Sequence, residues 1–268
     1  MPHILSATKL TAGYGGKEVV HETDLLLPSG QISVIIGANA CGKSTLLKTL
    51  ARLLPPLSGD VTLDGTSIRK IAPKQLARTL GILPQSPIAP EGISVSDLVG
   101  RGRYPYHSFL HGAGRRDNEA VAEALDLMGI AEFAGHNIDE LSGGQRQRVW
   151  IAMALAQQTD ILLLDEPTTF LDVAHQIEIL DLLTDINKRH GSTIVMVLHD
   201  VNLAARYADY IFALRDGILI AEGYPREVIT AERVRDVFGL DCAVTVDPVS
   251  GSPLISPKGR HHTGTMPR

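Results

Sequence analysis

A glycine-rich octapeptide constrains the fold of this chain more than any other feature. It reads Gly37-Ala38-Asn39-Ala40-Cys41-Gly42-Lys43-Ser44 and satisfies the pattern G-x-x-x-x-G-K-[ST], in which backbone N–H groups surround phosphates. A short apolar and β-branched run precedes it at 31–36, and a stretch of helical composition follows at 43–54. Strand, loop and helix in this order are the context that a phosphate-binding loop needs. The sequence therefore predicts an α/β fold with a nucleotide site.

The residues of this loop have different tasks in holding a triphosphate. Gly37 and Gly42 provide the backbone freedom that lets the loop turn its N–H groups inward. Lys43 is expected to reach the β- and γ-phosphates, and the Ser44 hydroxyl, with Thr45 beside it, is placed for Mg²⁺. We therefore expect ATP and Mg²⁺ to bind at residues 37–45.

A second anion site is predicted at the start of another helix. The run Ser142-Gly143-Gly144-Gln145 follows Leu141 and leads into a helical stretch that ends near residue 158. Backbone N–H groups and a hydroxyl at the positive end of a helix suit an anion. Ser142 is also a good helix cap after a turn, and this alternative is compatible with an anion site.

Two adjacent carboxylates follow the apolar run at 161–164. Asp165 is expected at the carboxyl edge of a parallel sheet, where α/β folds bind ligands, and should hold Mg²⁺ through water. Glu166, next to it, is expected to orient or deprotonate the attacking water. The alternative is a common strand ending of the form Asp-Glu-Pro, but the two anion sites favour a hydrolase.

Taken together and in this order, these motifs resemble the ATP-binding cassette (ABC) ATPase family. The resemblance implies a RecA-like parallel sheet core, an N-terminal antiparallel β subdomain and an inserted α-helical subdomain at about 86–157. It also implies a twofold homodimer in which each chain gives its P-loop to one site and its Ser142–Gln145 segment to the other. We expect one cassette over 1–247. The stretch 248–268, rich in Pro, Gly, Ser and His, is expected to be a flexible tail.

The resemblance assigns roles to four further residues. His199, after the strand expected at 193–198, would bind the γ-phosphate and hold Glu166, although a histidine at a strand end is commonly structural. Gln85 resembles the glutamine that touches Mg²⁺ and reports the nucleotide state to the helical subdomain. Tyr14 resembles the aromatic residue that stacks on adenine; its alternative is a solvent-facing turn. Asp172 matches the loop that crosses the dimer interface.

Three positions of the octapeptide depart from the usual pattern or add chemistry. ABC proteins usually have Pro and Gly where this chain has Ala38 and Ala40. If position 40 needs a positive φ, alanine there costs roughly 1 kcal/mol. Cys41 lies at a helix N-terminus, where positive potential is expected to lower the thiol pKa; packing in the interior is the alternative.

Composition excludes some classes of partner and location. The net charge of −5, with Lys and Arg scattered, gives no footprint for nucleic acid, and we expect none as a partner. No apolar run approaches the ~20 residues that cross a bilayer, and the first residues do not resemble an export signal, so we expect a cytoplasmic protein. The two cysteines, Cys41 and Cys242, are expected to be reduced.

Three segments narrow the resemblance to the ferric-siderophore importer ATPases, with cobalamin and haem importers similar. They are the runs at 99–106, 168–172 and 199–209. In those systems two ATPase chains carry two transmembrane permease subunits at the cytoplasmic face of the membrane, and an extracytoplasmic binding protein delivers the chelate. The alternative is a soluble ABC ATPase with no transport role; a small-molecule kinase would leave Glu166 and the second anion site unused.

Overall fold

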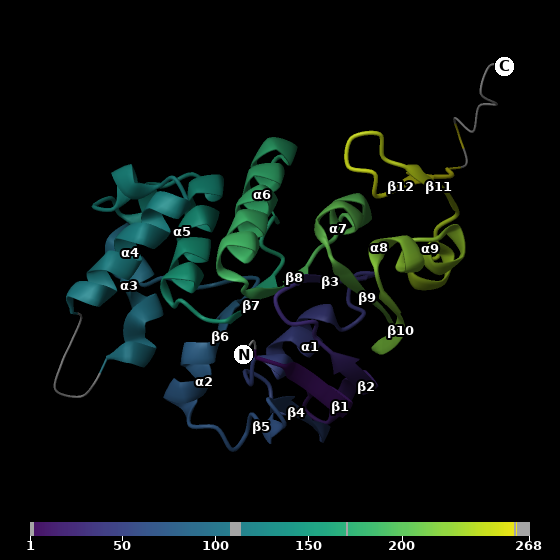
Figure 1. The fold of residues 1–268 in the computed structure, drawn as a ribbon, viewed down its shortest axis with the longest axis horizontal. Coiled ribbons are helices and arrows are strands. Elements are labelled where there is room, and N and C mark those ends of the chain that lie inside the picture. Colours follow the sequence, from purple (N-terminus) through teal and green to yellow (C-terminus); the bar gives the residue numbers. More distant parts are fainter. Residues whose placement is uncertain (1–2, 108–113, 170, 260, 262–268) are drawn as a thin grey trace.

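Strands with the apolar composition expected at 31–36, 161–164 and 193–198 form the centre of the molecule (Figure 1). The computed structural model describes residues 3–107, 114–169, 171–259 and 261. A six-stranded sheet has the order β10-β9-β3-β8-β7-β6 and is parallel except for the hairpin of β9 and β10. Its strands are β3 (Ile32–Gly37), β6 (Leu80–Leu83), β7 (Ile161–Asp165), β8 (Thr193–Val197), β9 (Tyr210–Arg215) and β10 (Ile218–Gly223). The expected parallel core is confirmed.

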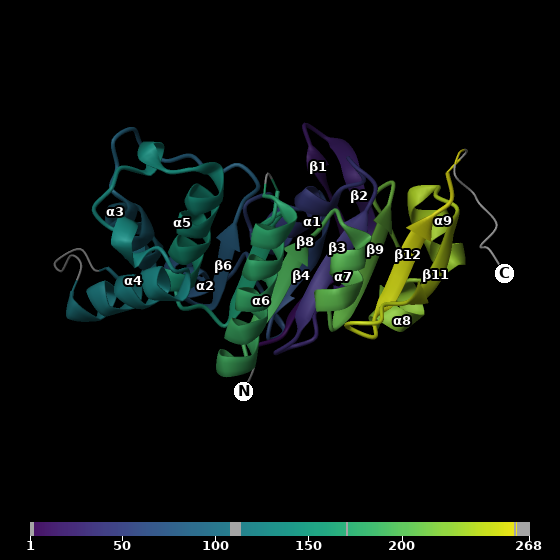
Figure 2. The ribbon, with the colours of Figure 1, turned by 90° about the horizontal axis from the view of Figure 1, so that it is seen from above.

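Alternate residues of each strand enter two separate cores, which explains the continuous apolar runs. Leu162 and Leu164 pack with the helices above the sheet, including α6 (Val173–His190) and α7 (Val201–Tyr207). Leu163 packs on the other face with α1 (Lys43–Leu50) and the N-terminal strands. Figure 2 shows α6 and α7 on one side of the sheet and α1 on the other. A sheet covered on both faces exposes only its edges and strand ends.

The expected N-terminal antiparallel subdomain is also confirmed. A four-stranded sheet has the order β2-β1-β4-β5, and the turn between β1 and β2 contains Gly15 and Gly16 at positive φ. Its strands are β1 (Leu5–Tyr14), β2 (Lys17–Leu26), β4 (Ser58–Leu63) and β5 (Thr66–Ser67). Helix α2 (Pro73–Thr79) then leads into the edge strand β6.

The residues between β6 and β7 form a helical subdomain beside the sheet. Its elements are α3 (Val95–Gly100), the 3₁₀ helices η1 (Arg101–Tyr106), η2 (Ala131–Phe133) and η3 (Ile138–Glu140), and the helices α4 (Arg115–Leu127) and α5 (Gly143–Ala156). Buried Arg103 holds η1 in place. Its guanidinium donates to Asp117 at 2.9 Å and to the Ala156 carbonyl at 2.8 Å, and it lies 3.9 Å from the Tyr106 ring centroid. None of the described helices is both long and apolar enough to cross a membrane.

The C-terminal part corrects the expectation of a flexible tail at 248–268. The chain continues through α8 (Pro225–Val228) and α9 (Ala231–Phe238) into β11 (Cys242–Val246), which pairs with β12 (Pro253–Pro257). Asp247 accepts hydrogen bonds from the Ser250 hydroxyl and the Val249 N–H, and these bonds fix the turn between the strands. Ile255 is buried against the main core. Pro, Gly and Ser here build a hairpin, and only residues 260 and 262–268 of the expected tail lie outside the described residues.

Candidate nucleotide-binding and hydrolytic site

The P-loop leads from β3 into α1 and borders a pocket of about 550 Å³ at the carboxyl edge of the sheet. Gly37 has a φ of 154°, and a Cβ there would lie 2.3 Å from the Leu214 carbonyl oxygen. Gly42 has a φ of 103°, and its Cβ would lie 3.0 Å from the Val19 oxygen. Both positions therefore require glycine. The pocket is lined by Tyr14, Val19, Asn39, Ala40, Cys41, Gly42, Lys43, Ser44, Thr45, Gln85, Glu166 and His199.

The Lys43 ammonium group lies inside the loop. Its side chain is buried, and Nζ donates to the carbonyl oxygens of Gly37 at 2.9 Å and Ala38 at 2.8 Å. Two neutral carbonyls are weaker partners for a cation than phosphate oxygens are. The loop thus keeps a positive charge at the position where a triphosphate would be bound.

Asp165 and Ser44 form a site whose chemistry fits Mg²⁺. The Ser44 hydroxyl donates to Asp165 Oδ1 at 2.8 Å, while the buried Oδ2 has no hydrogen-bond partner among the residues that the structure describes. Asp165 is 1% exposed, and this burial raises its carboxyl pKa above the usual value, against the opposing effect of the Ser44 hydrogen bond. An unpartnered carboxylate oxygen beside a hydroxyl is the oxygen donor set that a hard divalent cation prefers.

Glu166 is held by contacts to both carboxylate oxygens. His199 Nε2 lies 2.7 Å from Oε1, and the Thr169 hydroxyl donates to Oε2 at 2.9 Å. Glu166 and His199 come together because they follow β7 and β8, which are adjacent parallel strands. Glu166 also has a φ of 56°, an uncommon conformation for a side chain of this size and one that recurs at functional sites. Sequence analysis missed Thr169, whose only signal was a hydroxyl three residues after Glu166.

Residues from several elements complete this side of the site. Tyr14, at the end of β1, and Gln85, after β6, are both exposed and line the pocket. Gly37 and Ala38 line an adjoining cavity with Asn39, His199 and Phe238. Phe238 belongs to α9 and was not predicted, because nothing in its sequence context places it near residue 199.

The helix start that was predicted as a second anion site lies away from the chain's own P-loop. The Ser142 hydroxyl accepts the Gln145 N–H at 3.3 Å, and Gln145 Oε1 accepts the Ser142 N–H at 3.0 Å, so the helix cap is present. Ser142, Gly143, Gly144 and Gln145 are not among the described residues that line the P-loop pocket. The capped helix start at Ser142 therefore lies outside the pocket of the chain's own P-loop.

Asp172 lies beside this second site. A Cβ placed on Gly144 would be 3.5 Å from Leu171, and Asp172 caps α6 by accepting the His175 N–H at 3.0 Å. That hydrogen bond lowers the Asp172 pKa. Phe170, part of the same expected interface loop, lies outside the described residues. The loop around Asp172 and the Gly143–Gly144 pair thus share one face of the molecule.

Cys41 corrects a prediction about reactivity. Its thiol is buried in the core between the sheet, α1 and the N-terminal strands. This burial raises the thiol pKa, although the Lys43 charge opposes the shift. The expectation of a lowered pKa is wrong, because desolvation outweighs the potential of the helix end. We expect iodoacetamide to alkylate Cys41 at least about tenfold more slowly in the native chain than in urea, as measured by mass spectrometry. Equal rates in the two conditions would contradict this burial.

Ala40 adopts the positive φ that the sequence raised as a condition, at 60°. Ala40→Gly is expected to raise the free energy of unfolding by up to about 1 kcal/mol, because glycine has no Cβ strain in this region. Urea denaturation measures the change. Ala51→Gly is the matched control: Ala51 has a φ of −81° at the end of α1, so glycine there should lower stability. Equal signs for the two variants would count against strain at Ala40.

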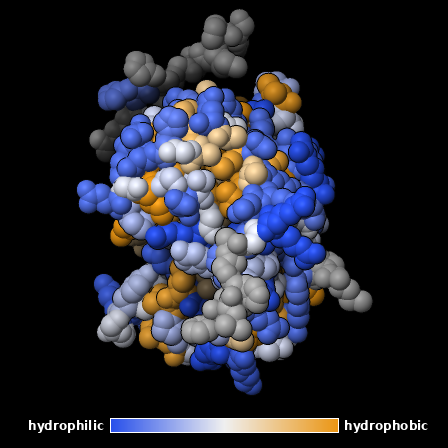
Figure 3. Space-filling model, turned by 90° about the vertical axis from the view of Figure 1, so that its left-hand side faces the viewer, coloured by the Kyte–Doolittle hydropathy of each residue, from blue (hydrophilic) through white to orange (hydrophobic). Residues whose placement is uncertain are grey.

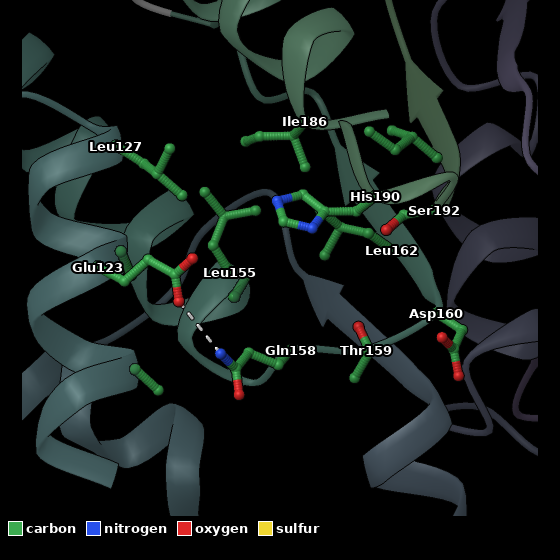
Figure 4. Close-up of a pocket in the computed structure, with 14 residues that line it drawn as sticks. Glu123, Leu127, Leu155, Gln158, Thr159, Asp160, Leu162, Ile186, His190 and Ser192 are labelled. Atoms are coloured by element: carbon green, nitrogen blue, oxygen red, sulfur yellow. Dashed lines mark hydrogen bonds between the residues drawn. The ribbon is translucent and has the colours of Figure 1, made fainter. Parts of the chain in front are cut away.

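A different cavity lies at the opposite edge of the sheet, before β7 and β8 begin (Figure 4). It measures about 290 Å³ and separates α4 from the end of α6. Leu127, Leu155 and Ile186 form apolar walls, and Glu123 accepts a hydrogen bond from Gln158 at its rim. None of the residues predicted to bind nucleotide lines it, so this cavity marks the junction between the helical subdomain and the core.

A P-loop beside a buried Asp-Glu pair at the end of a parallel strand is the arrangement of a nucleoside triphosphatase. A family model described as ABC transporter matches residues 20–169, and the chain belongs to the ABC transporter family. It binds and hydrolyses ATP, as the enzymes of this family do.

Similar proteins cover nearly the whole chain. The petrobactin import ATP-binding protein FpuD of Bacillus anthracis is 52% identical over 260 residues, with 97% of this chain and 95% of that protein covered. The ferric enterobactin transport ATP-binding protein FepC of Escherichia coli (strain K12) is 48% identical over 256 residues, with 96% and 94% covered. The chain is therefore similar to import ATPases along nearly its whole length, well beyond residues 20–169 that the family model matches.

Solved structures agree with this fold. An inward-facing structure assigned to a metal-chelate type ABC transporter has a TM-score of 0.82 at 28% identity and covers 97% of this chain and 98% of its own. A dimeric bacterial ABC transporter cassette has a TM-score of 0.74 at 29% identity, with 82% and 98% covered. These similarities support dimerisation and membership of a transporter complex.

Proposed function

We propose that this chain is the ATP-hydrolysing subunit of an importer that carries an iron–siderophore complex through a separate transmembrane permease. The observation that carries the proposal is the similarity to siderophore import ATPases over the entire described chain. The site supports ATP hydrolysis, because Lys43, Glu166 and His199 line one pocket, and Asp165 accepts a hydrogen bond from Ser44 of the same pocket.

The residues of the site have separate roles in binding ATP and in hydrolysis. The P-loop N–H groups and Lys43 bind the phosphates, and Tyr14 stacks on the adenine. Ser44, Asp165 and Gln85 hold Mg²⁺, which neutralises phosphate charge when bound. Glu166 accepts a proton as the water oxygen attacks the γ-phosphorus and the bond to the leaving ADP oxygen breaks. His199 keeps the Glu166 carboxylate oriented and donates toward the γ-phosphate.

The second anion site works across a homodimer. Ser142–Gln145 and Asp172 share a face that does not border the chain's own pocket, so a twofold partner brings them to the other P-loop. ATP bound between the two chains favours the closed dimer, and hydrolysis removes the contact that held it. This cycle of closing and opening drives the permease.

The permease contact lies on the helical subdomain. A hollow of about 720 Å³ is lined by residues of α3, η1 and α4, including Arg101, Tyr104 and Val121. Ile88, just after Gln85, is 92% exposed. Figure 3 looks onto this side of the molecule, where hydrophobic patches alternate with hydrophilic ones. A permease segment seated here would hold the chain at the cytoplasmic face of the membrane, and a binding protein on the other side would deliver the chelate.

Uptake tests the proposal. In cells whose only copy of this chain carries Lys43→Ala, uptake of labelled iron–siderophore should be lost while labelled cobalamin and haem uptake persist. Loss of cobalamin or haem uptake instead would reassign the cargo. Intact uptake of all three, with the variant shown not to bind ATP, would favour a soluble role. Membrane fractionation adds a second criterion, because a transporter subunit sediments with its permease and is released by detergent.

A further inference from the structure

The C-terminal module, residues 225–257, is bonded to the helix that follows His199. Asn202 Oδ1 accepts the Ile255 N–H at 2.7 Å, and Asn202 Nδ2 donates to the Ile255 carbonyl at 3.3 Å. The side-chain amide therefore occupies both backbone groups of one residue of β12, as a neighbouring strand would. Because Asn202 is in the first turn of α7, this contact fixes the end of the helix nearest to His199.

The loop at residues 198–200, called the His199 loop, is held by hydrogen bonds on both sides. On one side the Leu198 N–H donates to the Ile35 carbonyl at 3.3 Å, which extends the β8–β3 pairing. On the other side Asp200 caps α7 by accepting the N–H groups of Asn202 and Leu203 at 2.8 Å and 3.0 Å. Helix α7 has only seven residues, and a helix this short depends on tertiary contacts for its position. The Asn202–Ile255 pair is such a contact.

The same module reaches His199 from a second direction. Phe238, the last residue of α9, lines a cavity of about 480 Å³ with His199 and Asn39. Arg215 of β9 donates to the Asp236 carbonyl at 2.6 Å and so ties α9 to the sheet. His199 itself has a side chain 46% exposed, so few contacts hold the ring at its 2.7 Å distance from Glu166.

We propose that Asn202 is a positioning residue for ATP hydrolysis, which acts through His199 by clamping α7 to the C-terminal hairpin. The inference rests on the role of His199 in the proposed mechanism. In this proposal the C-terminal hairpin, which the family model does not cover, contributes to catalysis. Its contact with Asn202 keeps the His199 imidazole next to the Glu166 carboxylate.

Asn202→Leu in the full-length chain is the main test, because leucine has a similar size and no hydrogen-bonding groups. The kcat for ATP hydrolysis should fall by about tenfold to a hundredfold, with the KM for ATP little changed, since small displacements of catalytic groups act on the chemical step. Asn202→Asp, which keeps an acceptor for the Ile255 N–H, should give an intermediate kcat.

Asn187→Leu is the matched control. Asn187 Nδ2 also donates to two backbone carbonyls, those of Gly30 at 3.0 Å and Ser192 at 2.7 Å, but at the amino end of β8. The Asn187→Leu substitution should lower the thermal midpoint of unfolding at least as much as Asn202→Leu, and it should leave kcat within about twofold of the original chain. An equal fall in kcat for both variants would overturn the proposal, because the effect would then be one of general stability.

Asn202→Leu combined with His199→Ala tests whether Asn202 acts through His199. If Asn202 acts through His199, Asn202→Leu has no further effect on kcat once the imidazole is gone, whereas independent effects multiply. Multiplying effects, or an unchanged kcat for Asn202→Leu beside an impaired His199→Ala, would overturn the role of Asn202 alone. An unimpaired His199→Ala would instead remove His199 from the proposed mechanism.

Discussion

Glu166→Gln is expected to reduce ATP hydrolysis by at least about two to three orders of magnitude while MgATP binding persists, because a carboxamide accepts no proton from the attacking water. The substitution preserves the shape of the side chain, and its carbonyl still accepts the Thr169 hydroxyl that now bonds Oε2 at 2.9 Å. The P-loop is untouched. Bound ATP should then accumulate, and with it the closed dimer.

Three measurements check this first prediction. Single-turnover phosphate release gives the rate, filter binding gives the affinity for ATP, and size exclusion in MgATP detects the dimer. Glu178→Gln is the control, because this mostly exposed carboxylate pairs with Arg148 outside the pocket and should leave the rate unchanged. Hydrolysis by the Glu166 variant at more than a tenth of the original rate would remove Glu166 from its role as the base.

Asp165→Asn is expected to have opposite effects on activity and on stability. Hydrolysis should fall by about two to three orders of magnitude, because the amide replaces the charged oxygen offered to Mg²⁺. Stability should rise by an amount on the order of 1 kcal/mol, because burial raises the pKa of Asp165 and the ionised form therefore costs stability at neutral pH. The amide oxygen can still accept the Ser44 hydroxyl.

The pH dependence of the stability difference between the two chains tests the explanation for Asp165→Asn. A raised folded-state pKa means that the original chain gains stability as pH falls through that pKa, so the advantage of the asparagine variant should shrink at acidic pH. Urea denaturation at several pH values measures it. Asp160→Asn, at the exposed opposite end of the same strand region, should change neither activity nor this pH trend. A variant that is less stable at neutral pH would contradict the burial argument.

Local patterns predicted the parts of the site that depend on short segments. The P-loop, the carboxylates at the end of β7 and the cap at Ser142 are each encoded within a few residues, and the strand-like apolar runs before the P-loop and before Asp165 predicted the parallel sheet. The contact between His199 and Glu166 depends on one further step, the pairing of β7 with β8. The sequence did not determine whether Ala40 has a positive φ, and the structure shows that it does.

Contacts between distant segments were beyond local patterns. Phe238 lines a cavity with His199, and Ile255 bonds Asn202, although both residues lie far from residue 199 in the sequence. The composition of 248–257 is equally typical of a loop, and pairing with β11 decides in favour of a strand. Cys41 was misjudged for the same reason: the sequence shows the helix end, whereas the desolvation comes from strands elsewhere in the chain.

The separation of the P-loop pocket from the helix start at Ser142 has a genetic consequence for the proposed dimer. A lesion at Lys43 disables the P-loop of its own chain, and a lesion at Ser142 disables the site completed on the partner. When the two defective chains pair in the proposed dimer, both lesions fall in the same composite site and the other site is wholly intact. Two alleles that are each inactive alone should therefore restore a half-active transporter when co-expressed, whereas two Lys43 alleles should never complement each other.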